Sequence, residues 1–200
     1  MPKQVDHEQR KKKIAEATWR IIYERGVEGA SVRNIAAEAN ISLGSLRHYF
    51  PTQEELLRYA MEVVKERVKA RMMNIVSGSL SLQEQVLQLV LQMIPTDEES
   101  MAEMKVWYSF ISHFSQKEKE FQIEEDGIYQ GLHLILKQLE HRDMLCESVD
   151  VEVEAERLYA LVDGLAIHVM LNPQRLSYER IVLVVKTHLH SLYREGICKE

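Results

Sequence analysis

The feature that most constrains the fold of this sequence is a pair of short helix patterns between residues 31 and 50. Serine is favoured just before a helix, because its hydroxyl accepts a bond from an unpaired amide of the first turn. Ser31 is placed to cap a helix that reaches about Ala39, and Ser42 is placed to cap a second helix over residues 43–49. Only the letters "ANI" connect the two, so the chain must turn sharply there.

Apolar residues within these two helices predict how they pack. Ile35 and Ala36 lie on one face of the first helix, while Leu46 and Phe50 recur one turn apart in the second. We therefore expect Leu46 and Phe50 in the core of this unit, with Ile41 in the corner. Two short helices joined by a three- or four-residue corner are typical of a helix-turn-helix, a DNA-binding motif.

The segments on either side complete a helical unit. Residues 6–24 carry apolar side chains at helical spacing, and "GVEG" ends that helix. Pro51 closes the second short helix, because proline is disfavoured inside a helix but accepted near a start. Thr52 and Glu55 form a capping box for a long helix over about 53–75.

The remainder of the chain also predicts helices. The letters "SGSLS" at 77–81 favour a domain boundary. Further helix patterns occur near residues 82–94, 98–115, 117–140, 151–171 and 177–195. Only eight glycines and four prolines occur in 200 residues, which argues against a loop-rich or all-β chain. We therefore expect an all-α fold.

Charge is distributed unevenly along the chain. The formal net charge is −6, but residues 1–50 carry nine Lys and Arg against six Asp and Glu. A basic N-terminal segment on an acidic body is expected if only the first part meets a polyanion such as DNA. An uneven scatter of surface charge is the alternative. The run "RKKK" at 10–13 fits either a phosphate contact or a solvated helix face.

Other features exclude several classes of protein. Cys146 and Cys198 lie far apart and form no CxxC pair, so we expect no disulfide framework. The N-terminal sequence lacks the apolar core of a signal peptide. No apolar stretch approaches the roughly 20 residues that a membrane span requires. We therefore expect a soluble, cytoplasmic protein.

The segment 14–57 resembles the TetR family of one-component transcriptional regulators. The matching positions are Gly26, Gly29, Ser31, Ile35, Ala36, Ala39, Ile41, Ser42, Gly44, Ser45, Leu46, Tyr49, Phe50, Glu55 and Leu56. The later stretch "LVDGLAIHVML" is similar to the dimer helices of many members. The resemblance implies about nine helices, arranged as a three-helix DNA-binding head, a connecting fourth helix and a larger body.

The resemblance also implies a division of labour along the chain. We expect residues 1–52 to form the DNA-binding domain, with the helix-turn-helix at about 31–50, and residues 53–75 to form the connector. Residues 76–200 would bind a ligand and dimerise. The function implied is that of a repressor that binds a palindromic double-stranded DNA operator as a homodimer and is released by a small-molecule effector. No cofactor is implied.

Two residues depart from the family pattern. Members commonly carry tyrosine where this chain has Arg47, and lysine where it has Gln53; both positions usually contact phosphates. Arginine can donate two parallel bonds to phosphate or guanine. Gln53 removes a charge but can still donate a hydrogen bond. The form "SLRHYF" is similar to a subgroup that includes betaine-pathway repressors.

The resemblance and the chemistry of the second short helix together predict the DNA-binding residues. That helix would enter the major groove, where Gly44 removes a side chain that would hold it away from the bases. A glycine required by helix packing is the alternative. Arg47 could contact a base or a phosphate. The predicted DNA-binding residues are Arg33, Ser42, Leu43, Gly44, Ser45, Arg47, His48, Tyr49 and Gln53.

Two apolar stripes near the C-terminus are the expected dimer interface. They occupy residues 151–171 and 177–195, and two such helices from each subunit can form a four-helix interface. An intramolecular core is the alternative. The predicted interface residues are Leu158, Leu161, Gly164, Leu165, Val185 and Leu189.

The segment 101–136 is rich in methionine and aromatic residues, which could line a small-molecule pocket. The same spacing is also typical of plain core. The first candidates for ligand binding are Met104, Trp107, Phe110 and His113. By resemblance, we expect a bound effector to shift the fourth helix and change the spacing of the two heads.

Three other classes compete with this interpretation. An α-helical enzyme is disfavoured, because GxSxG, P-loop, HExxH and GxGxxG motifs are absent from the sequence. A metal site is disfavoured, because the pairs His133/His141 and His188/His190 lack a partner at ligand spacing. The third class is a TetR-like small-molecule-binding or interaction protein without operator binding. The intact caps, Gly44 and Arg47 argue against it.

Overall fold

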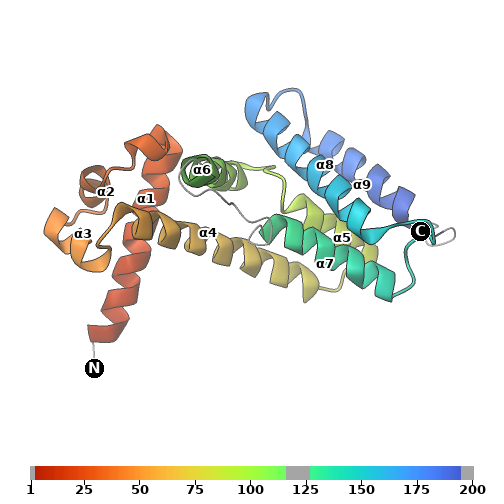
Figure 1. The fold of residues 1–200 in the computed structure, drawn as a ribbon, viewed down its shortest axis with the longest axis horizontal. Helices are drawn as coiled ribbons and strands as arrows, with labels where there is room; N and C mark the ends of the chain where they lie inside the picture. The colour runs from red at the N-terminus through yellow and green to blue at the C-terminus, as the bar shows by residue number, and fades with distance from the viewer. Residues whose placement is uncertain (1–2, 116–126, 195–200) are drawn as a thin grey trace. The chain divides into compact units, whose positions relative to one another are not determined.

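The computed structural model describes residues 3–115 and 127–194, and within these ranges the chain forms nine α-helices (Figure 1). They are α1 (Lys3–Gly29), α2 (Val32–Glu38), α3 (Leu43–Tyr49), α4 (Gln53–Val76), α5 (Leu82–Leu91), α6 (Glu98–Ser115), α7 (Gly127–His141), α8 (Val151–Leu171) and α9 (Tyr178–Leu192). The predicted all-α class and number of helices are confirmed. Of the helix expected near 117–140, residues 117–126 lie outside the described residues, and the remainder lies within α7. No helix in the described ranges is both long and apolar enough to cross a bilayer.

The chain divides into two compact units. The first comprises residues 1–70 and 102–119, and the second comprises residues 71–101 and 120–200. Both α4 and α6 therefore contribute to both units. The division of labour expected over residues 1–52, 53–75 and 76–200 stays a prediction.

The core of the first unit is built from α1 to α4 and part of α6. Ile35 and Leu46 are fully buried, and Phe50 is 4% exposed. They pack with Ile14 and Ile21 of α1 in one apolar cluster. The expected core placement of Leu46 and Phe50 is confirmed.

Both serine caps form as the sequence predicts. The Ser31 hydroxyl accepts a bond from the Asn34 amide at 3.2 Å, and the Ser42 hydroxyl accepts one from the Ser45 amide at 3.1 Å. Between the two helices Asn40 adopts a left-handed backbone with φ of 53°, which asparagine tolerates better than most residues. The corner between α2 and α3 is therefore closed within the four residues 39–42.

The first helix is longer than the apolar pattern predicts. It begins at Lys3 rather than near residue 6, and it is interrupted near its end by Gly26, whose φ of 72° is not helical. This is the first residue of "GVEG", so the predicted break is confirmed at that residue. Only glycine adopts such a conformation without strain.

Polar contacts hold the helices of the first unit together. Arg20 of α1 donates to Glu38 of α2 at 2.9 Å, and Arg67 of α4 donates to Glu16 of α1 at 3.2 Å. These exposed pairs fix helix orientation more than they add stability.

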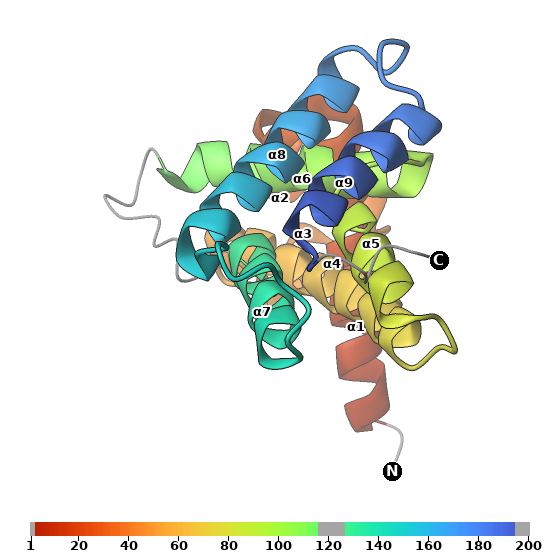
Figure 2. The same ribbon diagram turned by 90° about the vertical axis from the view of Figure 1, so that its right-hand side faces the viewer.

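The second unit has its own apolar core between α5, α7, α8 and α9. Fully buried aliphatic side chains come from each of these helices: Val90, Leu132, Leu136, Leu158 and Val185. Helices α8 and α9 lie side by side, as both views show (Figures 1 and 2).

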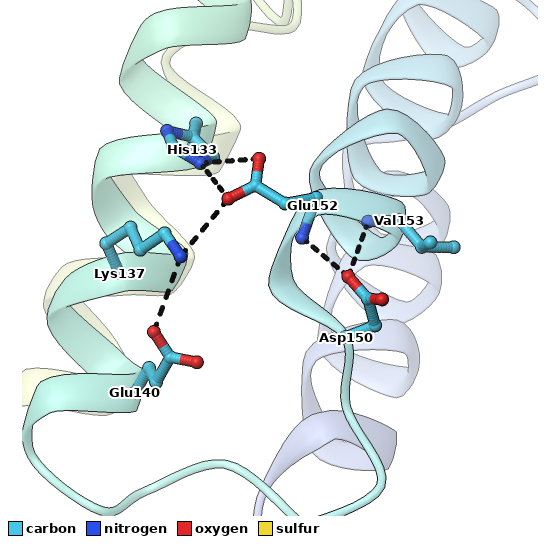
Figure 3. A network of polar contacts seen from close by, with 6 residues as sticks. All are labelled: His133, Lys137, Glu140, Asp150, Glu152 and Val153. Carbon is cyan, nitrogen blue, oxygen red and sulfur yellow. Dashed lines mark hydrogen bonds and ion pairs between the residues drawn. The ribbon is translucent and has the colours of Figure 1, made fainter.

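A polar network fastens α7 to the start of α8 (Figure 3). The Glu152 carboxylate lies 3.0 Å from Nε2 of His133 and 3.2 Å from Nζ of Lys137. Lys137 also reaches Glu140 at 3.5 Å. The Asp150 carboxylate caps α8 by accepting bonds from the amides of residues 152 and 153. The bond from His133, followed by that from Lys137, lowers the pKa of Glu152.

This network predicts a pH-dependent contribution to stability. A carboxyl group whose pKa is lowered on folding stabilises the protein above its ordinary pKa, and the effect is lost as the pH falls through the lowered value. We expect Glu152→Gln to lower the thermal unfolding temperature slightly at pH 7 and to have no effect at acid pH. Glu140→Gln, which removes only the outer contact to Lys137, should have a smaller effect. A difference between wild type and Glu152→Gln that persisted unchanged in acid would contradict this account.

Candidate nucleic-acid interface

The helix α3 has one inward and one outward face. Leu46 points into the core, whereas Gly44, Arg47 and His48 are exposed. The remaining predicted residues of the helix, Leu43, Ser45 and Tyr49, are half-buried. Of the predicted residues of α3, the structure therefore places Gly44, Arg47 and His48 on the exposed side of a short, anchored helix.

Gly44 has no role in packing within the described structure. A Cβ placed on it would approach only the Ser42 hydroxyl, at 4.0 Å, apart from its own helix backbone and chain neighbours. Its φ is not positive either. Glycine inside a helix is destabilising by roughly 1 kcal/mol relative to alanine. The packing alternative is thus unsupported, and the close approach of DNA at Gly44 stays a prediction.

Arg47 has no carboxylate partner among the described residues, unlike several other arginines of the first unit. Arg20 and Arg67 are paired with carboxylates. The guanidinium of Arg47 is exposed and makes no ion pair with the residues that the structure describes. An exposed, unpaired guanidinium has all five of its donors available for an external anion or base.

Two further predicted residues lie on neighbouring helices. Arg33 of α2 is exposed and, like Arg47, has no carboxylate partner in the described part of the chain. Gln53 begins α4, and its amide nitrogen donates to the Ala30 carbonyl at 2.9 Å. Gln53 therefore ties the start of α4 to the loop before α2, a role that the sequence did not reveal. Any contact from Gln53 to DNA would use the rest of its amide group.

The predicted ligand-binding residues all belong to α6. Trp107 and Phe110 are half-buried against the apolar cluster of the first unit, and Met104 is also half-buried. The side chain of His113 lies outside the described part of the structure. The packing of Trp107 and Phe110 is that of core residues, so the ligand role stays a prediction.

One polar cavity of about 110 Å³ lies in the second unit, between the ends of α4 and α5 and the start of α6. The Arg71 side chain donates to the Gln92 side chain across it at 3.2 Å. The bonds that Asp97 accepts from Ser100 lower the pKa of the Asp97 carboxyl group. A cavity of this size is too small for a drug-sized ligand, whose pockets measure about 300–1,000 Å³. None of the predicted ligand residues lines it.

The predicted dimer residues have unequal exposure. Leu158 and Val185 are fully buried within one chain, Leu189 is 2% exposed and Leu165 is 7% exposed. Leu161 is half-buried against the same core. The intramolecular alternative thus accounts for the burial of these five. Gly164 is different, because a Cβ there would meet nothing outside its own helix within 4 Å.

The histidine pairs considered for a metal site have other partners. His133 lies against Glu152, and Nε2 of His188 lies 2.8 Å from Oε1 of the buried Glu154. Within the described residues, no three His, Cys, Asp or Glu side chains gather in a way that could hold a metal ion.

Known protein families match both the N-terminal and the C-terminal part of the sequence. Residues 14–60 match the bacterial regulatory proteins of the tetR family, and residues 82–194 match the C-terminal part of the BetI-type transcriptional repressors. The chain is 52% identical to the HTH-type transcriptional regulator PksA of Bacillus subtilis (strain 168), over 96% of this chain and 94% of the relative. It is 26% identical to the HTH-type transcriptional regulator BetI of Vibrio campbellii (strain ATCC BAA-1116), over 94% of each.

Solved structures share the fold. A transcriptional regulator from Saccharomonospora viridis, solved in complex with choline, has a TM-score of 0.80 and 21% identity, covering 94% of this chain and 99% of that one. A regulator from Pseudomonas aeruginosa PAO1 has a TM-score of 0.73 and 26% identity, covering 92% and 89%. These relatives are transcriptional regulators rather than enzymes. The chain therefore belongs to the TetR family of transcriptional regulators, and its C-terminal part is of the BetI type.

Proposed function

We propose that this regulator represses transcription by binding a palindromic operator as a homodimer, with α3 of each subunit in the major groove. A small-molecule effector would release it. The observation that carries the proposal is the outward face of α3, where a glycine without a packing role stands beside an unpaired arginine. A helix that presents its N-terminal residues to base edges needs this combination of close approach and donors.

The charge of the N-terminal part of the chain also supports the placement of α3 against DNA. Residues 1–50 carry an excess of three positive charges on a chain that is acidic overall. Phosphate contacts supply most of the affinity of such a surface, and base contacts supply its specificity. Arg33 and Arg47, both exposed, are placed on the two helices of the motif.

The outward side of α8 supports the homodimer. Apolar and small residues recur there every three or four positions, at Ala160, Gly164, Ile167 and Leu171. Ile167 is 41% exposed and Leu171 is 77% exposed, and Leu183 of the adjacent α9 is 56% exposed. Exposed apolar side chains in a row mark an interaction surface more often than a solvated one. A second copy of the same face would cover this row and meet Gly164 closely, as a twofold interface requires.

The first test is operator binding itself. We expect the protein to shift DNA from directly upstream of its own gene, and Arg47→Ala to weaken that binding by about 1–3 kcal/mol if the guanidinium reads guanine. If it contacts phosphate alone, binding should weaken on all sequences and show a shallower salt dependence. Mobility shifts at two salt concentrations, with a coding-region fragment as second DNA, separate the two cases.

Arg175→Ala is the control for this test, because it removes an exposed arginine of the second unit. It should leave binding unchanged. If wild type did not bind the upstream DNA, the chain would be the helical interaction protein without operator binding. If Arg47→Ala bound both fragments like wild type, Arg47 would lie outside the interface.

Gly44→Ala distinguishes an effect on the stability of α3 from an effect on operator binding. Alanine should raise the stability of α3 by up to about 1 kcal/mol, because it costs less entropy in a helix than glycine. The new methyl group should hold α3 away from the bases and weaken operator binding at least tenfold, which is about 1.4 kcal/mol. Gly127→Ala, at an open position at the start of α7, is the matched control. Unchanged operator binding by Gly44→Ala would show that α3 does not approach DNA closely.

A charged substitution on the outward row of α8 tests the proposed dimer surface. Ile167→Glu should place two carboxylates against each other at a twofold interface and raise the dimer dissociation constant at least tenfold, about 1.4 kcal/mol. Leu134→Glu is the control, because Leu134 is an exposed leucine on α7, away from the α8 row. Sedimentation equilibrium gives both constants. A dimer that tolerated Ile167→Glu but dissociated with Leu134→Glu would place the interface elsewhere.

A further inference from the structure

The first turns of α1 extend beyond the apolar core of the first unit. The helix begins at Lys3, yet its first buried side chain among those described is Ile14. About three helical turns therefore precede the core. In both views the N-terminal part of α1 projects from the rest of the first unit (Figures 1 and 2). Turns without core contacts need another reason to be held in place.

One side chain of this projecting part lies against the recognition helix. The ring centroid of His7 is 4.7 Å from that of Tyr49, and 6.4 Å from that of His48. The rings of His48 and Tyr49 are themselves 5.6 Å apart and nearly perpendicular. These separations are within the range of favourable aromatic contacts. Three rings from two helices thus form a cluster at the C-terminal end of α3.

The next turn of α1 is fastened to α4. The Lys11 ammonium lies over the ring of Tyr59 at 5.8 Å and 3.8 Å from the Glu8 carboxylate. Burial, followed by the negative charge of Glu8, raises the pKa of the Tyr59 hydroxyl group. These contacts hold α1 against α4 within the turn that follows His7, and so they fix the position from which its ring reaches Tyr49.

Helix α3 needs such a support at this end. It has seven residues, and Leu46 and Phe50 anchor only its inner side. Tyr49 is half-buried and His48 is exposed, so neither ring is locked by the core alone. The last turn of a short helix frays unless side chains from elsewhere restrain it.

We propose that His7 is a positioning residue for the recognition helix: its ring holds Tyr49 in the orientation that contacts operator DNA. The inference rests on the proposed operator binding through α3. His7 acts through Tyr49 and makes no contribution to affinity when Tyr49 is absent. The N-terminal turns of α1 thus contribute to DNA binding through His7, which positions the recognition helix.

Three variants test this proposal by fluorescence anisotropy with the DNA upstream of the gene. His7→Ala should weaken binding about 2- to 12-fold, the equivalent of one aromatic contact. His7→Phe keeps a ring at the same place and should bind within about twofold of wild type. In a Tyr49→Ala background, His7→Ala should cause no further loss, because coupled residues are not additive. A further loss there, or failure of His7→Phe to restore binding, would mean that His7 contacts DNA itself and would overturn the positioning role.

A second measurement does not depend on DNA. Amide hydrogen exchange of residues 46–50 in the free protein should be faster in His7→Ala than in wild type, and restored in His7→Phe. His7 lies outside the apolar core, so the thermal unfolding temperature should hardly change. Unchanged exchange in His7→Ala would overturn the proposal even if wild type bound no DNA. If Arg47→Ala weakens binding while His7→Ala alters neither binding nor exchange, the operator-binding proposal stands and this one fails.

Discussion

The anchoring of a two-turn helix by its neighbours is the constraint on which the rest of the first unit depends. A helix of seven residues is too short to be stable alone. Leu46 and Phe50 insert into the core, and the Ser42 hydroxyl satisfies an amide of the first turn. These contacts use the inner side and the start of the helix. The anchoring of α3 does not require its outer side, so that side can carry a glycine and polar side chains.

The parts of the fold that the sequence predicts are those set by local patterns. Ser31 and Ser42 cap their helices because a cap involves residues only three positions apart. The core positions of Leu46 and Phe50 follow from helical spacing. The contacts of Gln53 with Ala30 and of His7 with Tyr49 join residues far apart in the sequence. Such contacts depend on how helices are placed in space, which periodicity does not determine.

Helix α8 shows the same limit at the proposed dimer surface. Its apolar residues form two rows, and spacing alone does not tell which row faces the protein's own core. Leu158 and Val162 are fully buried in the second unit. Ile167 and Leu171 remain exposed, as does Leu183 on α9. The buried row thus completes the core of one chain, while the outward row with Gly164 is what a second chain would cover. The interface residues predicted from the sequence lie mostly in the buried row, and the use of α8 and α9 for dimerisation stays a prediction.

The central claim is that two copies of α3 contact one operator, and hydroxyl-radical footprinting on the DNA upstream of the gene tests it most directly. A twofold dimer should protect two half-sites related by inverted symmetry, with centres separated by about one turn of DNA, roughly 34–36 Å, or a multiple of it. Gly44→Ala should lose both protected regions together, since both subunits carry the substitution. A single protected region, or two in direct rather than inverted orientation, would contradict a symmetric dimer that reads DNA through α3.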